Sequence, residues 1–464
     1  MTIPNISKSS HHRGTTSRDD GRAESSLFHS GARVLFLATI FAAPWAFGAT
    51  QPWAWGTLMV LALLTLVLWA AGCVHRGVLQ VKWSPLYWPF LLLLLIACVQ
   101  LFAGLTADHV ATREALLKLI TNFVFFFLAG QLLFTQPESG RAIRRWGLVV
   151  TLLAFGLSVL ALAQVMTTGK GLIYWSIATP FGPFGPYVSA NDYCGLMEML
   201  IPVTAGYVLS GSSRKVPRLL LWLVVGVALA TILISGSRAG AAVMLVEVLL
   251  FGFIVFWQRP AGVWHRAFPL IAVGVLISSG AFAWMASTGR VGNRALSVLQ
   301  SENSLEGKLG DRFWVAEDTL RMARSHLRQG IGVGSFETVF PAYMTHPSEL
   351  HWSHAHNDFA EGLAETGVAG GVLLIWGLVI FFRRAFLHFP ERLRARWGWI
   401  QIGAVVGVVG LLCHSLVDFN LRVSANAAWF VVCAAVATHL SSLPDRPTRV
   451  VLESASERDE GFLN

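Results

Sequence analysis

Long apolar runs separated by short polar segments fill most of the chain. A membrane-spanning helix needs about 20 mostly apolar residues, and as few as about 17 can suffice. Two of the candidate spans contain charged residues: the fourth, 115–134, carries Lys118, and the sixth, 192–210, carries Asp192 and Glu198. The pattern predicts an all-α integral membrane protein with about twelve transmembrane helices. The candidate spans lie near 34–50, 55–74, 85–104, 115–134, 146–166, 192–210, 218–235, 239–257, 267–287, 366–382, 398–417 and 424–440.

The composition supports this interpretation and excludes several classes of protein. Apolar residues make up 54% of the 464 positions and charged residues only 13%, whereas a soluble domain carries roughly 25% charged residues. The chain is therefore not a soluble enzyme, a disordered protein or a collagen-like protein. Its five cysteines lie in or beside apolar runs without a CxxC pair. Neither a disulfide framework nor a metal cluster is expected from them.

The distribution of basic residues predicts the orientation of the helices. The formal net charge is +9, and in membrane proteins Lys and Arg gather in the cytoplasmic connections. If both termini are cytoplasmic, every cytoplasmic connection in the twelve-span arrangement is basic, as Arg383 and Arg384 illustrate after the tenth span. The positive charge thus needs no nucleic-acid partner to explain it.

The predicted organisation leaves one large segment on the outer side of the membrane. About 80 residues separate the ninth and tenth spans, and a loop of that length within a compact domain is usually functional. A second outer segment, 167–191, is rich in Gly, Pro and aromatic residues. The expected parts are a disordered cytoplasmic tail (1–32), helices one to nine (33–287), a large periplasmic loop (288–365), helices ten to twelve (366–440) and a second cytoplasmic tail (441–464).

Two motifs in the large loop have simple structural interpretations. Residues 311–328, DRFWVAEDTLRMARSHLR, have apolar positions close to a helical period, which is typical of an amphipathic helix whose arginines contact water or lipid headgroups. Residues 330–336, GIGVGSF, resemble a phosphate-binding loop, but no strand precedes them and no GK[ST] follows. A tight turn that returns the chain to the membrane is the favoured interpretation.

Three histidines, His351, His354 and His356, lie within six residues just before the tenth span. They could bind a metal, since imidazole suits zinc, but no cysteine or HExxH spacing accompanies them. One of them could instead act as a general base, or they could simply be solvated. We expect Ser353 to cap a helix that begins here, with His356, Ala360 and Leu363 on one face and Asp358, Glu361 and Glu365 on another.

Two further places carry charge at the predicted outer ends of helices. Arg238 lies in SGSRAG, a very short turn between the seventh and eighth spans. Its guanidinium could reach lipid headgroups or could bind a phosphate in a bidentate manner. The end of the eleventh span supplies a polar cluster that is either functional or an interhelical salt bridge. Its members are His414, Asp418, Asn420 and Arg422.

The region from Gly330 to Gly371 resembles the signature region of the superfamily of O-antigen ligases and Wzy-type polymerases. The ligase motif reads His-Asn, nine residues, Gly, two residues, Gly, and His356-Asn357, Gly367 and Gly370 fit it without a gap. Ser237-Arg238, Arg312 in DRFWVAEDTL, Asn191 in FGPYVSANDYCG and the segment HSLVDFNLRVSAN also match features of the family. The resemblance covers roughly residues 170–440.

The resemblance implies a GT-C-like, all-helical glycosyltransferase of the bacterial inner membrane. Its donor would be a glycan linked to undecaprenyl pyrophosphate, and its acceptor a hydroxyl of lipid A–core or of another glycan at the periplasmic face. His356 would be the catalytic base, and Arg238 and Arg312 would hold the pyrophosphate, with no metal, nucleotide or other cofactor. Further candidates for substrate binding are Asn191, Asn357, His354, Asp418 and Arg422.

A multi-span secondary transporter is the alternative to a glycosyltransferase. Transporters place ionisable residues and broken helices near the middle of the membrane, whereas the charged groups here gather outside it, which favours the enzyme. The motif spacing leans toward a ligase over a polymerase, but the sequence leaves that choice open.

Overall fold

The computed structural model describes residues 16–134, 139–167, 183–211, 216–258, 302–346, 351–387, 389–395, 397–439 and 448–451. The order of elements, given by their bounds, is as follows: α1 (Thr16–Ala42), η1 (Ala43–Trp45), η2 (Phe47–Ala49), α2 (Pro52–His75), β1 (Val78–Val81), α3 (Tyr87–Phe102), α4 (His109–Leu133), α5 (Ser139–Thr167), α6 (Ala190–Leu209), α7 (Arg218–Ser235), α8 (Arg238–Gln258), α11 (Glu302–Ser325), α12 (Phe336–Val339), η3 (Phe340–Tyr343), α13 (Asp358–Leu387), α14 (Phe389–Arg394), α15 (Gly398–His414), η4 (Asn420–Arg422), α16 (Ser424–Thr438) and β2 (Thr448–Val451).

The prediction of a helical membrane protein is confirmed in its general form. Among the described residues, seven helices are long and apolar enough to cross a membrane, and α3, α15 and α16 are shorter apolar helices. Helix α6 is not among these candidates, and it carries Asp192 and Glu198. The ninth predicted span, 267–287, lies outside the described residues. The count of twelve spans and the side of the membrane on which each loop lies therefore stay predictions.

The helices and predicted spans differ mainly at the two ends of the chain. Helix α1 begins at Thr16, inside the segment 1–32, although its apolar part begins only at Leu27. Residues 448–451, within the segment expected as a second tail, form β2 and pair antiparallel with β1. A hydropathy pattern cannot reveal either feature, because polar helical turns and short strand pairs do not require apolar runs.

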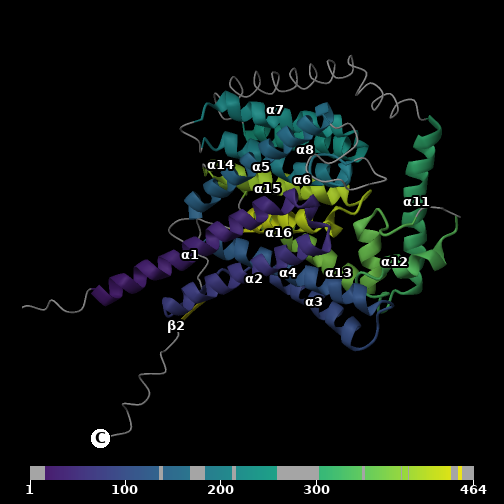
Figure 1. The fold of residues 1–464 in the computed structure, drawn as a ribbon, viewed down its shortest axis with the longest axis horizontal. Helices are drawn as coiled ribbons and strands as arrows, with labels where there is room; N and C mark the ends of the chain where they lie inside the picture. The colour runs from purple at the N-terminus through teal and green to yellow at the C-terminus, as the bar shows by residue number, and fades with distance from the viewer. Residues whose placement is uncertain are drawn as a thin grey trace, which may run out of the picture.

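Helices α6 and α15 form the centre of the molecule (Figure 1), and glycines allow them to approach closely. A Cβ atom added to Gly407 of α15 would lie 2.8 Å from the Cα atom of Met199 in α6. Added Cβ atoms at Gly403 and Gly206 would likewise collide with backbone of the facing helix. Small residues at such contacts are typical of helix packing in membranes. This packing holds the ends of α6 and α15 in fixed relative positions.

The described part of the large loop lies at one end of the molecule (Figure 1). The segment 330–334 returns the chain from α11 toward the membrane helices, and its three glycines all have positive φ. Gln100 of α3 holds this turn: its Nε2 donates to Gln329 O at 2.7 Å, and its Oε1 accepts from Val333 N at 3.1 Å. The tight-turn interpretation of GIGVGSF is therefore confirmed.

Helix α13 is kinked at Gly367, the first glycine of the sequence motif. Gly367 has φ 65° and ψ −164°, a conformation open essentially to glycine alone. A Cβ atom there would also lie 2.6 Å from Leu327 O, which accepts a hydrogen bond from Val368 N at 2.7 Å. The kink separates a buried first segment, which begins at Asp358, from the long apolar segment that corresponds to the tenth predicted span. Glycine at the first glycine position of the motif thus allows the backbone to kink within α13.

Candidate active site

His356 lies immediately before α13 in a strained backbone conformation. Its φ is +49°, in the left-handed region that residues other than glycine rarely adopt. The next residue, Asn357, is the helix cap: its Oδ1 accepts hydrogen bonds from Phe359 N at 3.1 Å and Ala360 N at 2.9 Å. Strain of this kind persists where surrounding contacts impose it, and it is frequent at functional sites.

Two details of the sequence-based interpretation are wrong at this point. Asn357 rather than Ser353 caps the helix. Because His356 precedes the helix in a left-handed conformation, it does not share a helical face with Ala360 and Leu363. The His356 ring instead contacts Asp418, in the segment that follows α15.

Asp418, in that segment, is the polar centre of the site. Its residue is 2% exposed, and its Oδ1 lies 3.0 Å from His356 Nδ1. Its Oδ2 lies 3.4 Å from Nη1 of Arg312 and accepts a hydrogen bond from Nδ2 of Asn191. The same carboxylate is therefore contacted by one side chain each from α11, α6 and the segment before α13.

The surroundings of Asp418 favour its ionised form. Burial opposes ionisation, but the hydrogen bond from His356 and the positive charge of Arg312 outweigh it and hold the pKa of Asp418 below its ordinary value. The carboxylate therefore stays ionised at neutral pH, and an ionised carboxylate can only accept hydrogen bonds. His356 Nδ1 must then carry the shared proton, and in the neutral imidazole the lone pair is on Nε2. This is the arrangement a general base requires.

Aromatic side chains border the His356 ring. The centroid of the His356 ring lies 4.9 Å from that of Phe419 and 5.6 Å from that of Trp352, both in edge-to-face geometry. Contacts of this type restrict the ring orientation. The His356 side chain is 17% exposed, so the ring is confined and yet accessible from outside.

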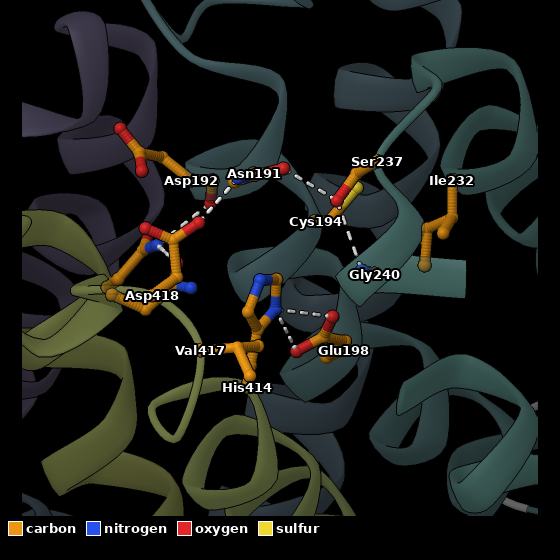
Figure 2. Close-up of polar contacts among 12 residues, drawn as sticks. Asn191, Asp192, Cys194, Glu198, Ile232, Ser237, Gly240, His414, Val417 and Asp418 are labelled. Atoms are coloured by element: carbon orange, nitrogen blue, oxygen red, sulfur yellow. Dashed lines mark hydrogen bonds and ion pairs between the residues drawn. The ribbon is translucent and has the colours of Figure 1, made fainter. Parts of the chain in front are cut away.

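The two arginines proposed to bind pyrophosphate are related to this centre differently: Arg312 contacts Asp418, and Arg238 follows a residue that is hydrogen-bonded to Asn191. Arg312 of α11 also donates to Val417 O at 3.2 Å, and its side chain is 31% exposed. Arg238 is the exposed first residue of α8. Its neighbour Ser237 is buried and donates to Asn191 Oδ1 at 2.7 Å, as Figure 2 shows. Arg238 is thus one residue away from the hydrogen-bond network of Asp418.

The three histidines of the loop have three different carboxylate partners. His351 is exposed and contacts Glu337, whereas His354 Nδ1 lies 3.0 Å from Glu361 Oε1. His356 contacts Asp418. Within the described ranges, no group of three or more His, Cys, Asp and Glu side chains is placed to hold a metal ion. The geometry gives no support to a metal site built from the three histidines.

Arg422, another candidate for substrate binding, faces a cluster of buried acids on α13. Its Nη2 lies 2.7 Å from Glu365 Oε2, and its Nε lies 3.2 Å from Glu361 Oε1 and 3.9 Å from Asp358 Oδ1. The prediction that these three acids share one helical face is confirmed. The contacts agree with the interhelical salt bridge that the sequence left open, and substrate binding by Arg422 stays a prediction.

Several polar contacts near the site were not found from the sequence. Glu198 of α6 lies 2.8 Å from His414 Nδ1, and both side chains are fully buried. Glu361 accepts from Ala355 N at 2.8 Å, which ties α13 to the histidine segment. Position within the His-Asn-x9-Gly motif was an available signal for Glu361. For Glu198 the available signal was an acid inside an apolar helix. Such a residue is by default a candidate for a functional role.

Comparison with known proteins assigns this region to a family. Residues 223–375 match a family model described as O-antigen ligase, and no curated protein matches the chain. The matched segment includes Arg238, Arg312, His356 and Gly367, while Asn191 and Asp418 lie outside it. Such a match indicates a membrane-bound ligase or polymerase of glycans. The resemblance seen in the sequence is therefore confirmed: residues 223–375 of this chain are similar to the O-antigen ligase family.

Proposed function

We propose that this protein is an inner-membrane glycosyltransferase that moves a glycan from undecaprenyl pyrophosphate to an acceptor hydroxyl at the periplasmic face. The observation that carries the proposal is the contact of His356 Nδ1 with Asp418 Oδ1 at 3.0 Å, beside the Arg312 guanidinium. A base with an orienting carboxylate next to a cation is what transfer from a pyrophosphate donor requires. The family match supports the same class of reaction.

His356 is the general base in this proposal. Its Nε2 takes the proton of the acceptor hydroxyl while the acceptor oxygen bonds to the anomeric carbon of the donor sugar. The bond between that carbon and the pyrophosphate oxygen breaks, and undecaprenyl pyrophosphate leaves with the electron pair. Asp418, held ionised, keeps the ring in the required tautomer and stabilises the imidazolium that forms. The proton then passes to solvent, which can reach the partly exposed ring.

Arg238 and Arg312 bind the pyrophosphate. The leaving group carries two or more negative charges, and guanidinium groups pair with phosphate oxygens in a bidentate manner. Arg238 is the first residue of α8, where the helix dipole also favours an anion. With these charges supplied by the chain, the proposal invokes no metal, nucleotide or other cofactor.

The proposal includes the predicted topology and partners. Both termini are cytoplasmic, the site is periplasmic, and membrane lipids surround the multi-pass bundle. The acceptor is lipid A–core if the protein is a ligase, or another lipid-linked glycan if it is a polymerase. Among the candidate binding residues, His354 lies two residues before the base, although its ring contacts Glu361. Asn357 uses its amide to cap α13 and to donate to Leu416 O at 3.0 Å.

A secondary transporter has one observation in its favour. The fully buried pair Glu198 and His414 lies between α6 and α15, and transporters use such groups within the membrane. The remaining chemistry, however, gathers at helix ends around Asp418. A deletion strain separates the two functions: loss of the transferase should accumulate glycan linked to undecaprenyl pyrophosphate. Loss of a small-solute transporter would leave that pool unchanged, and that result would contradict the proposal.

Removal of either arginine should impair transfer without preventing membrane insertion. We expect Arg238→Ala and Arg312→Ala each to lower the transfer rate roughly 10- to 150-fold, because a charge-assisted contact to phosphate contributes about 1.5–3 kcal/mol. Lys at either position should restore activity only in part, since the bidentate geometry is lost. The rate is measured with purified protein and lipid-linked donor.

Arg324→Ala is the matched control for Arg312, because Arg324 is exposed on the same helix. It should leave the rate close to that of the unmodified protein. Full activity of Arg238→Ala, both in cells and after purification, would instead show that Arg238 only contacts lipid headgroups.

A further inference from the structure

Asn191 has both ends of its side-chain amide engaged by protein groups. Its Nδ2 donates to Asp418 Oδ2, and its Oδ1 accepts from Ser237 Oγ at 2.7 Å. Figure 2 shows the amide between these two partners. One donor and one acceptor of the amide are thus used within the protein, out of the two of each that it has. The amide therefore links Ser237, just before α8, to Asp418, in the segment after α15.

The connection continues beyond both partners of Asn191. Ser237 Oγ also accepts from Gly240 N at 3.0 Å, so the same hydroxyl caps α8. On the other side, Asp418 contacts His356. One continuous set of hydrogen bonds therefore runs from the start of α8, through the start of α6, to the ring of His356. Ser237 and Asp418 are buried, at 5% and 2% exposure, so water competes little for these bonds.

We propose that Asn191 and Ser237 are positioning residues that fix the catalytic base relative to the start of α8. We call Ser237, Asn191 and Asp418 the polar bracket. This inference rests on the proposed function, in which Arg238 at the start of α8 holds the pyrophosphate and His356 activates the acceptor. It gives Asn191 a different role from the substrate binding expected from the sequence.

The reaction gives a physical reason for such a bracket. The acceptor oxygen must approach the anomeric carbon on the side opposite the departing pyrophosphate, so the base and the anion site must keep a fixed separation. Productive geometry requires alignment to about 0.5 Å, and a displacement of about 1 Å can cost about 100-fold in rate. Arg238 and His356 belong to different elements, and their relative position depends on side-chain contacts between those elements. The polar bracket supplies a buried contact of this kind.

Ser237 variants test the remote end of the bracket. Ser237→Ala removes the hydroxyl and should lower kcat about five- to tenfold with little change in the KM for the donor. The neutral hydrogen bond to Asn191 is then lost two contacts away from the base, together with the cap on Gly240 N. Ser237→Thr keeps the hydroxyl and should restore most of the rate. Thr204→Val is the control, because Thr204 is also buried but its hydroxyl donates to Leu200 O within α6 and not to a residue of the bracket.

Asn191 variants test its centre. Asn191→Asp keeps the shape and can still accept from Ser237, but it places a second carboxylate against Asp418. We expect it to lower kcat more than Ser237→Ala does, with protein abundance and thermal unfolding in detergent recorded for each variant. In the double variant Asn191→Ala with Ser237→Ala, the second change should add little to the first, because both act through the same contact.

The outcomes separate this inference from the proposed function. If the unmodified protein transfers glycan and His356→Ala does not, but Ser237→Ala equals the unmodified protein, the bracket is wrong and the proposed function stands. Fully additive losses in the double variant would likewise contradict the bracket and show that Ser237 acts only by capping α8. No rescue by Thr would also contradict it, since Thr keeps the hydroxyl that the bracket requires. If the unmodified protein transfers no glycan from a lipid-linked donor, the proposed function fails and this inference fails with it.

Discussion

His356→Ala is expected to lower the rate of glycan transfer about 10²- to 10⁴-fold, the usual contribution of a general base. The acceptor hydroxyl is a poor nucleophile until a base takes its proton, and His356 is the loop histidine in contact with Asp418. The protein should still insert and accumulate in the membrane, since the ring is partly exposed and does not belong to the apolar core. The measurement is the single-turnover rate with purified protein and a lipid-linked donor.

His351→Ala is the control for this prediction, because His351 is exposed and contacts only the exposed Glu337 among the described side chains. It should retain nearly the full rate, and EDTA should have no effect on the unmodified protein. Suppose instead that EDTA inhibits and that His351→Ala and His354→Ala are as damaging as His356→Ala. The three histidines would then act as a metal site, and the assignment of the base to His356 would be wrong.

The sequence predicted the parts of this protein that depend on local composition. Apolar runs located the helices because burial in lipid demands about 20 apolar residues in succession, and α7 begins and ends where the hydropathy pattern placed it. The family motif identified His356, Arg238 and Arg312 as candidates. It also marked Gly367, whose positive φ explains why that position needs glycine.

The arrangement of the site could not be predicted in the same way, because its contacts join distant segments. Asn191 and Asp418 are 227 positions apart, and Arg312 and Asp418 are 106 apart. In a sequence, an acid or amide side chain that binds substrate cannot be distinguished from one that binds another side chain of the protein. The cap of α13 was misassigned for a related reason: Ser353 and Asn357 are both good capping residues, and only the backbone turn at His356 decides between them.

Arg422 provides the strongest test of which residues stabilise the site and which bind substrate. We expect Arg422→Ala to lower the free energy of unfolding by about 3–5 kcal/mol, because removing one partner of a buried ionic network leaves uncompensated charge. Asp358, Glu361 and Glu365 are all less than 10% exposed and face the same guanidinium. The loss should appear as reduced abundance in the membrane and a lower unfolding temperature in detergent.

A second change distinguishes a structural role of Arg422 from substrate binding. Glu365→Gln in the Arg422→Ala background should recover part of the lost stability, because it removes one of the unpaired charges. The oxygen of the new side-chain amide can still accept from Gly334 N, as the Glu365 carboxylate does at 2.8 Å. Arg328→Ala, at an exposed arginine between α11 and α12, should change neither abundance nor unfolding temperature. If Arg422→Ala is as stable as the unmodified protein but raises the KM for the donor or acceptor, Arg422 binds substrate. The network with the three acids would then be incidental, since a group that the fold does not need can be removed without unfolding it.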